Sequence, residues 1–246
     1  MSALRLHDVT LGYERHPAVH HLDGMFPEAR LTAVVGPNGS GKSTLLKGVA
    51  GALPPLSGRI DLGGLRQDEI AYLPQDNGVD RGFPMTLHDL VSLGLWRRRG
   101  LFGGIGREDR RRIDEAFAAV GLDGFQGRPV GSVSGGQLQR ALFARVLLQD
   151  ARLILLDEPF TALDARTAAD LIDLIRRWPR EGRTVIVVLH DLDLVRETCS
   201  DTLLLAREMV AWGPTDQALR PENLLKARRL SEAWADHAHA CQRTAA

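Results

Sequence analysis

Four short runs of this chain are almost continuously aliphatic, and each has the length of a strand rather than of a helix. They cover residues 31–35, 70–73, 153–156 and 185–189. Such runs are typical of parallel strands that are buried on both faces. The first thirty residues instead alternate loosely between apolar and polar side chains and contain turn-forming glycine and proline, which favours an antiparallel β-layer. The pattern therefore predicts an α/β fold with an antiparallel β subdomain at its start.

A different pattern begins at about residue 86 and lasts to about residue 149. Strand-like runs are missing there, and apolar residues recur at helical spacing, as in Leu87, Leu90 and Val91. We interpret residues 86–149 as an α-helical subdomain inserted into the α/β core, within a single domain over residues 1–246. We also expect helices near residues 42–50 and 166–178, a pair of strands near 201–213, and a helical or frayed end of the chain with a tail over about 228–246.

The composition is that of an ordinary soluble globular protein. Of 246 residues, 44% are hydrophobic and 25% are charged. Lys and Arg together number 31, as do Asp and Glu, so no overall basic charge attracts nucleic acid and no such partner is expected. No run approaches the ~20 apolar residues of a membrane-spanning helix, and the first residues lack a signal-peptide core. With two cysteines, Cys199 and Cys241, a reducing cytosol is the expected setting.

The first motif with chemical meaning follows the apolar run at 31–35. It fits G-x-x-x-x-G-K-[ST], a loop whose backbone N–H groups hold phosphate oxygens ahead of a helix N-terminus. The glycines let several N–H groups converge on one anion. The lysine supplies charge for the β- and γ-phosphates, and the serine hydroxyl is placed to bind Mg²⁺. The motif and the residue after it are Gly36, Pro37, Asn38, Gly39, Ser40, Gly41, Lys42, Ser43 and Thr44.

Polar side chains follow three other predicted strands. Asp157 ends the run at 153–156, which carries its carboxylate to the edge of the sheet beside the phosphates, where we expect it to bind Mg²⁺. Glu158 comes next, His190 follows residues 185–189, and Gln75 follows residues 70–73. Taken alone, Glu158 could be a helix-entry residue, His190 a structural histidine, and Gln75 a solvated loop residue.

A third motif opens a predicted helix with the residues Val133, Ser134, Gly135, Gly136 and Gln137. The serine can cap the helix, and the N-terminus of the helix can accept an anion.

The three motifs, in this order and at this spacing, resemble the ATPase subunit of ATP-binding-cassette (ABC) transporters over most of the chain. The third motif of that family usually begins with leucine, and here Val133 takes its place, with a side chain that we expect to face the core. The resemblance implies a P-loop ATPase core with an antiparallel β subdomain and an inserted α-helical subdomain. It also implies that ATP and Mg²⁺ are the cofactors.

The same resemblance implies a role for each residue at the strand ends. Glu158 is the expected general base that polarises the attacking water, which is typically worth ~10²–10⁴-fold in rate. Gln75 is expected to reach the metal and this water, and His190 to bond the γ-phosphate. Tyr13 matches the aromatic residue that stacks on adenine.

The resemblance further implies a homodimer in which two subunits pack head to tail. Ser134, Gly135, Gly136 and Gln137 of one subunit would then face the γ-phosphate held by the other. Asp164, in the segment Thr-Ala-Leu-Asp after the second motif, is expected to cross the same interface. Two equivalent sites follow from this symmetry.

The segment from Gln75 to Trp96 resembles the ATPases of zinc and manganese importers. In the family this region shapes a groove that receives a helix of the permease, and Phe83, Pro84 and Met85 are apolar residues suited to that contact. The expected partners are integral-membrane permease subunits and a periplasmic or extracellular substrate-binding protein acting through them. The ATPase itself would be peripheral, at the cytoplasmic face of the membrane.

Two alternatives keep the ATPase and change the process that it powers. They are an iron-chelate or haem importer and a soluble ABC ATPase in cofactor assembly. A translation factor would carry two cassettes and a DNA-repair ATPase long heptad repeats, and neither feature is in the sequence. A scaffold that binds nucleotide without hydrolysis would lack Glu158 or His190, and both are in the sequence.

Three other polar clusters are interpreted as solvent-exposed segments rather than as functional sites. Arginines at 97–99 and 110–112 are expected on solvated helix faces, with a membrane-surface contact left open for the first cluster. His237, His239 and Cys241 stand at alternate positions, a spacing that suits an extended chain. Because no fourth ligand accompanies them, we expect a frayed tail rather than a metal site.

Overall fold

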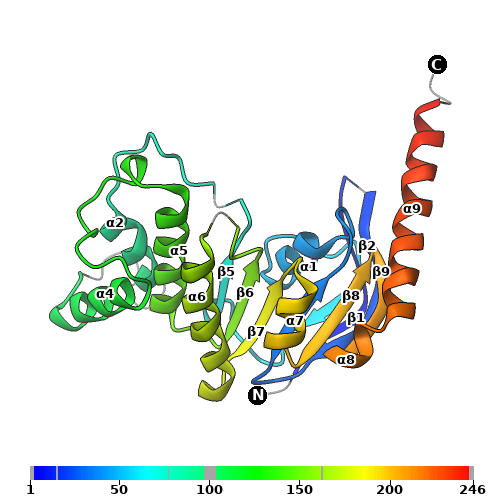
Figure 1. Cartoon of the computed structure of the whole chain (residues 1–246), viewed down its shortest axis with the longest axis horizontal. Coiled ribbons are helices and arrows are strands. Elements are labelled where there is room, and N and C mark those ends of the chain that lie inside the picture. Colours follow the sequence, from blue (N-terminus) through cyan, green and yellow to red (C-terminus); the bar gives the residue numbers. More distant parts are fainter. Residues whose placement is uncertain (1–2, 15, 77, 97–103, 162, 244–246) are drawn as a thin grey trace.

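The computed structural model describes residues 3–14, 16–76, 78–96, 104–161 and 163–243, with side chains as far as residue 233. Its centre is a six-stranded sheet in the order β5-β6-β7-β3-β8-β9 (Figure 1). All neighbouring pairs are parallel except β8 and β9, which are antiparallel. The strands are β3 (Leu31–Val35), β5 (Ile70–Leu73), β6 (Leu153–Asp157), β7 (Thr184–Val188), β8 (Asp201–Ala206) and β9 (Glu208–Pro214).

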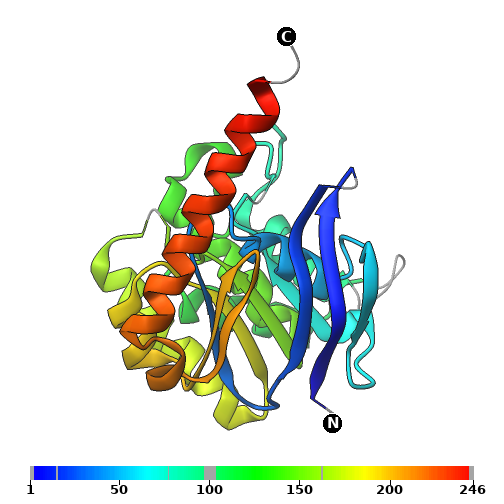
Figure 2. The same cartoon turned by 90° about the vertical axis from the view of Figure 1, so that its right-hand side faces the viewer.

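A second, antiparallel sheet covers one face of this centre. It has the order β2-β1-β4 and stands beside the main sheet in Figure 2. Phe26 of this sheet, Leu45 of the helix after β3 and Leu155 of β6 belong to one buried apolar cluster, which joins the two layers. The elements are β1 (Leu4–Tyr13), β2 (His16–Phe26), β4 (Ser57–Asp61) and α1 (Lys42–Val49).

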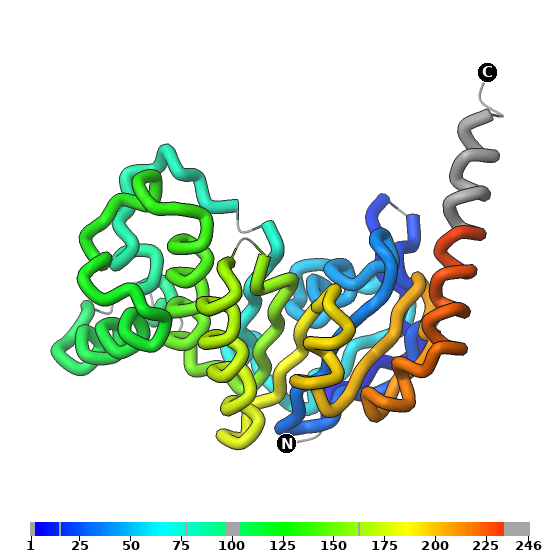
Figure 3. The backbone as a smooth tube through the Cα atoms, viewed as in Figure 1, coloured from blue at the N-terminus to red at the C-terminus, as the bar shows by residue number. Residues whose placement is uncertain are grey.

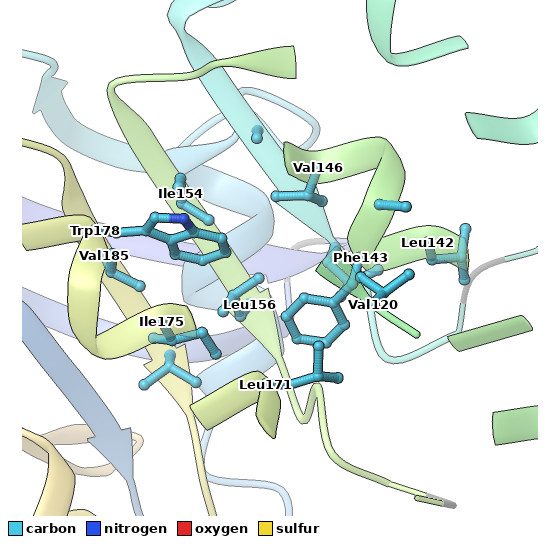
Figure 4. Close-up of a cluster of buried hydrophobic side chains, with 14 of the residues drawn as sticks. Val120, Leu142, Phe143, Val146, Ile154, Leu156, Leu171, Ile175, Trp178 and Val185 are labelled. Carbon is cyan, nitrogen blue, oxygen red and sulfur yellow. The ribbon is translucent and has the colours of Figure 1, made fainter. Parts of the chain in front are cut away.

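The segment between β5 and β6 is helical, apart from turns, and extends to one side of the sheet (Figure 1). A second buried cluster joins it to the other face of the sheet: Phe143 of the last of these helices, Leu156 of β6 and Trp178 lie together in Figure 4. The helical elements here are α2 (Leu87–Ser92), η2 (Leu93–Leu95), α4 (Arg107–Ala119), η3 (Val130–Ser132) and α5 (Gly135–Gln149).

The remaining helices cover the sheet and end the chain. They are η1 (Gln67–Glu69), α6 (Ala165–Arg177), η4 (Trp178–Glu181), α7 (Leu192–Thr198), α8 (Thr215–Ala218) and α9 (Pro221–Arg243). The backbone path in Figure 3 shows α9 beginning against the edge of the molecule formed by β8 and β9. None of the helices in the described part of the chain combines the length and the apolar character that a bilayer-spanning segment requires.

The predicted fold class is confirmed, and one prediction about its end is wrong. Of the helical and frayed forms expected for the end of the chain, we preferred a frayed tail around the alternating histidines, but α9 continues as a helix to Arg243. The segment is rich in alanine, leucine, glutamate and arginine, which favour helix formation. Ala227 also packs in the second buried cluster, which holds the start of α9 against the core. The side chains of His237, His239 and Cys241, and the whole of residues 97–99, lie outside the described residues.

Candidate nucleotide site

The carboxyl ends of the parallel strands meet at one edge of the main sheet, and a cleft of about 520 Å³ lies there. Each polar wall of the cleft is formed by a residue one or two positions after a strand, or by the loop after a strand. Gln75 follows β5, Glu158 follows β6 and His190 follows β7, while the loop after β3 forms the floor. The lining residues are Ala18, Asn38, Gly39, Gly41, Lys42, Ser43, Thr44, Gln75, Glu158 and His190.

The floor of the cleft is a glycine-rich turn that ends in the N-terminus of α1. Gly41 is the N-cap and has a φ of 94°, in the left-handed region. A Cβ atom built there would lie 2.6 Å from the carbonyl oxygen of Ala18, so only glycine fits. Among the described residues, no side chain caps α1. Its first N–H groups are therefore free to bind an anion in the cleft.

Lys42 brings a positive charge to this loop from a nearly buried position. Its side chain is only 6% exposed, and its Nζ donates to the carbonyl oxygens of Gly36 and Pro37, each at 2.9 Å. Burial lowers the pKa of Lys42, and the carboxylates of Glu158 and Asp157 act in the opposite direction. The ammonium group is thus held over the loop where phosphate oxygens would lie.

Asp157 and Ser43 supply a pair of oxygen ligands beside the loop. The Ser43 hydroxyl donates to Oδ1 of Asp157 at 3.1 Å, and Asp157 is only 1% exposed. Burial raises the pKa of Asp157, although the Ser43 hydrogen bond opposes this shift. A buried carboxylate with a hydroxyl at its side is the kind of oxygen donor set that Mg²⁺ prefers. These residues therefore fit a magnesium ion.

Glu158 is held by donors from both neighbouring strand ends. Nε2 of Gln75 donates to Oε2 at 2.8 Å, and Nε2 of His190 lies 2.5 Å from Oε1. The backbone of Glu158 has a φ of 48°, a left-handed conformation that is uncommon for a residue with a side chain. The carboxylate is therefore held in a fixed position at the wall of the cleft, where it can bind a water molecule. His190, which we expected at the γ-phosphate, here lies against Glu158.

Several predicted residues lie outside the lining of the cleft. Gly36, Pro37 and Ser40 belong to the loop and Asp157 lies beside it, but none of the four is among the residues that line the cleft. Tyr13 is 48% exposed, and its hydroxyl oxygen accepts a hydrogen bond from Nζ of Lys47 at 3.2 Å. Its role in stacking on adenine stays a prediction.

The third motif lies away from the cleft and starts α5. Ser134 is the N-cap: its hydroxyl accepts from the backbone N–H of Gln137 at 3.2 Å, and the Gln137 side chain accepts from the N–H of Ser134 at 3.0 Å. Val133 is buried, as expected. In the described part of the chain, none of Ser134, Gly135, Gly136 and Gln137 lines the cleft.

Asp164 has a local role that the sequence did not indicate. Its carboxylate is the N-cap of α6 and accepts from the backbone N–H of Thr167 at 3.0 Å and from its hydroxyl at 2.8 Å. These bonds lower the pKa of Asp164, with the backbone bond the main cause. Ala162, in the same motif, lies outside the described residues.

A second missed residue is Gln139, whose Nε2 donates to the carbonyl oxygen of Pro159 at 3.0 Å. In the sequence it is a polar residue in the interior of a helix, and no pattern marks its partner. The capping box of Thr86 and Asp89 at the start of α2 was also not predicted. Here the sequence does contain a signal, the spacing [ST]-x-x-[DE].

The family model described as "ABC transporter" matches residues 19–161. This chain belongs to the ABC transporter family. It is 40% identical, over 200 residues, to the manganese transport system ATP-binding protein MntA of Synechocystis, covering 79% of this chain and 77% of that protein. It is also 38% identical over 229 residues to the zinc transport system ATP-binding protein TroB of Treponema pallidum, with 92% and 86% of the two chains covered.

Solved structures place the fold in the same family. A dimeric bacterial ABC transporter cassette superposes with a TM-score of 0.75 at 27% identity, over 86% of this chain and 98% of that one. The ABC ATPase fold is therefore confirmed, together with the predicted activity, ATP hydrolysis coupled to transport.

Proposed function

We propose that this ABC ATPase powers the import of a transition-metal ion, manganese or zinc, through membrane permease subunits. The observation that carries the proposal is the identity of 38–40%, over most of the chain, to ATP-binding proteins named for manganese and zinc transport. The alternatives of an iron-chelate or haem importer and of a cofactor-assembly ATPase have weaker support: a transporter described as "putative metal-chelate type" superposes with a TM-score of 0.79, but at 29% identity.

In the proposed mechanism, the phosphates of ATP lie on the turn before α1. The free N–H groups of α1 and the ammonium of Lys42 bind the phosphate oxygens. Ser43 and Asp157 would hold Mg²⁺, with Gln75 as a further proposed ligand, and the ion would supply positive charge to neutralise the phosphates. Glu158 accepts a proton from the attacking water, a role supported by its fixed carboxylate between two donors. His190 moves from Glu158 to the γ-phosphate when ATP is bound.

The catalytic unit that we propose is a homodimer with two composite sites. Its support is that Ser134 and Gly135 are exposed at the start of α5, where a second molecule can reach them, and that a similar cassette is described as dimeric. Ser134, Gly135, Gly136 and Gln137 of one subunit complete the site of the other, and Asp164 lies at the same interface.

A docking surface for the permease is proposed on the helical side of the molecule. Phe83 is 59% exposed, and Leu93 and Trp96 are also exposed, although all three are large apolar residues. Met85, by contrast, packs against the second buried cluster described above. Of Phe83 and Met85, only Phe83 is therefore free for contact with a partner. The substrate-binding protein acts on the far side of the permease, and the ATPase is held at the cytoplasmic face of the membrane.

Metal uptake by cells that lack the gene tests this function. Cells complemented with the wild-type chain are expected to recover manganese or zinc accumulation, and cells with Glu158→Gln are not, at equal amounts of protein. Iron-chelate uptake is the control and should stay the same in all three strains. Loss of iron-chelate uptake with normal manganese and zinc accumulation would contradict the proposal.

A further inference from the structure

Gln139 is a buried amide in the second turn of α5, outside the cleft. It is 9% exposed, and its Nε2 donates to the carbonyl oxygen of Pro159 at 3.0 Å. Buried polar side chains in folded proteins are almost always hydrogen-bonded. What stands out here is the partner, because Pro159 directly follows the proposed general base, Glu158.

The turn that Gln139 contacts has a backbone conformation that needs support. Glu158 has a φ of 48°, and a residue with a side chain keeps such a conformation only where its surroundings hold it. On the side-chain end, Gln75 and His190 hold the carboxylate. On the backbone side, the hydrogen bond from Gln139 holds the peptide group between Pro159 and Phe160. The direction of the carboxylate therefore depends on both sets of contacts.

The same face of α5 makes a second contact with this segment. Phe143 lies one turn after Gln139, and its ring stacks on that of Phe160 with centroids 6.3 Å apart and planes 14° from parallel. Residues at i and i+4 share one face of a helix, so one face of α5 contacts two successive residues, Pro159 and Phe160. Figure 4 shows Phe143 within the apolar cluster between α5 and the end of β6.

We propose that Gln139 is a positioning residue for ATP hydrolysis, which ties the turn at residues 158–159 to α5. The hydrogen bond crosses from the helical subdomain to the core, because α5 lies in the inserted helical segment and Glu158 follows the central strand β6. A shift of α5 relative to the sheet therefore moves the carboxylate of Glu158. Since α5 starts at the motif proposed to meet the partner's ATP, the inference rests on the proposed function and deepens it.

The test replaces Gln139 with methionine, which has a similar length and volume but no donor. We expect kcat of ATP hydrolysis to fall about 10- to 100-fold, the scale of a catalytic group displaced by about 1 Å, with KM for ATP unchanged. Gln139→Glu keeps the shape and places an acceptor against the carbonyl oxygen, and it should lower kcat at least as far. The matched control is Gln149→Met, the same change on the same helix, and it should hydrolyse ATP like the wild type.

Two results would overturn the inference. The first is a kcat for Gln139→Met equal to that of Gln149→Met. The second is a Gln139→Met protein whose circular dichroism or ATP affinity is lost together with kcat, since this would show a purely structural role. Glu158→Gln, measured alongside, keeps the proposed function separate. If Glu158→Gln abolishes hydrolysis and Gln139→Met does not reduce it, only the role of Gln139 is wrong. If Glu158→Gln hydrolyses normally, the proposed mechanism itself fails.

Discussion

Two helices in this molecule, α1 and α5, begin at glycine-rich segments, and the surroundings of these two N-termini differ. The start of α1 lines the cleft together with Lys42, Glu158 and His190, and in the described chain no side chain caps it. The start of α5 carries its own cap, because the hydroxyl of Ser134 takes up one of the free N–H groups. It stands at the surface, outside the cleft.

The difference bears on our proposal that one chain holds only part of a catalytic site. A bare helix start with a buried lysine and two carboxylates nearby can bind a phosphate chain and a metal ion by itself. A capped and exposed helix start can add N–H groups to an anion that something else already holds. This supports our proposal that the start of α5 acts on ATP bound to a second copy of the chain.

The largest effect on turnover is expected from Glu158→Gln. The amide keeps the shape of the side chain and loses the proton acceptor, so hydrolysis should fall by about 10²–10⁴-fold. Because the phosphate loop is untouched, ATP binding should persist, and a stable dimer should accumulate in the presence of ATP. Phosphate release and sedimentation measure the two outcomes. A variant that hydrolyses ATP at nearly the wild-type rate would show that Glu158 is not the base.

Lys42→Ala should act one step earlier, on binding. A hydrogen bond from a charged donor contributes about 1.5–3 kcal/mol. Its loss should therefore raise the Kd for ATP by about 10- to 100-fold. A titration with a non-hydrolysable ATP analogue measures this change. An unchanged Kd with reduced turnover would instead place Lys42 in the chemical step alone.

Ser134→Ala tests whether Ser134 contributes to ATP hydrolysis as well as capping α5. Loss of the N-cap should lower the free energy of unfolding by about 1 kcal/mol. Thr86→Ala is the matched control, because Thr86 caps α2 in the same way and has no proposed contact with ATP. Thermal melts should show similar losses for both variants, while only Ser134→Ala also slows hydrolysis. Equal turnover in the two variants would mean that Ser134 serves the helix alone.

The smallest effect on turnover of the isolated subunit is expected from Phe83→Asp. Its exposed ring lies in neither helix start, so ATP hydrolysis should stay near the wild-type rate. Burying an unpaired carboxylate at the apolar docking surface should weaken binding to the permease by several kcal/mol, on the order expected for a buried unpaired charge. Copurification with the permease should therefore fail. Met209→Asp, on exposed Met209 of β9, is the control and should assemble normally. If Phe83→Asp unfolds the subunit, Phe83 is needed for folding and the docking role is wrong.

The strands and the helix after the phosphate loop could be predicted because aliphatic runs and the loop motif are local signals. Parallel strands share a carboxyl edge, so the sequence also indicated that Asp157, Glu158, His190 and Gln75 would meet. The bond between His190 and Glu158 could not be predicted, since strand order is not written in the sequence: β6 and β7 are neighbours, while β3, earlier in the chain, follows them in the sheet.

Long-range contacts account for most of what the sequence did not indicate. The amide of Gln139 and the carbonyl of Pro159 are twenty residues apart, and only the packing of α5 on the end of β6 brings them together. The tail was mispredicted for a different reason. The alternate spacing of the histidines suits an extended chain, whereas the helix-forming residues around them and the apolar contact of Ala227 favour a helix.

The central claim, that each site needs the α5 start of a second chain, is tested most directly by ATP turnover across a dilution series. Sedimentation of the same samples gives the fraction of dimer. If the sites are composite, specific activity rises with protein concentration and follows the dimer fraction formed with ATP. A specific activity that stays constant across the series, while sedimentation shows a monomer throughout, would contradict the account.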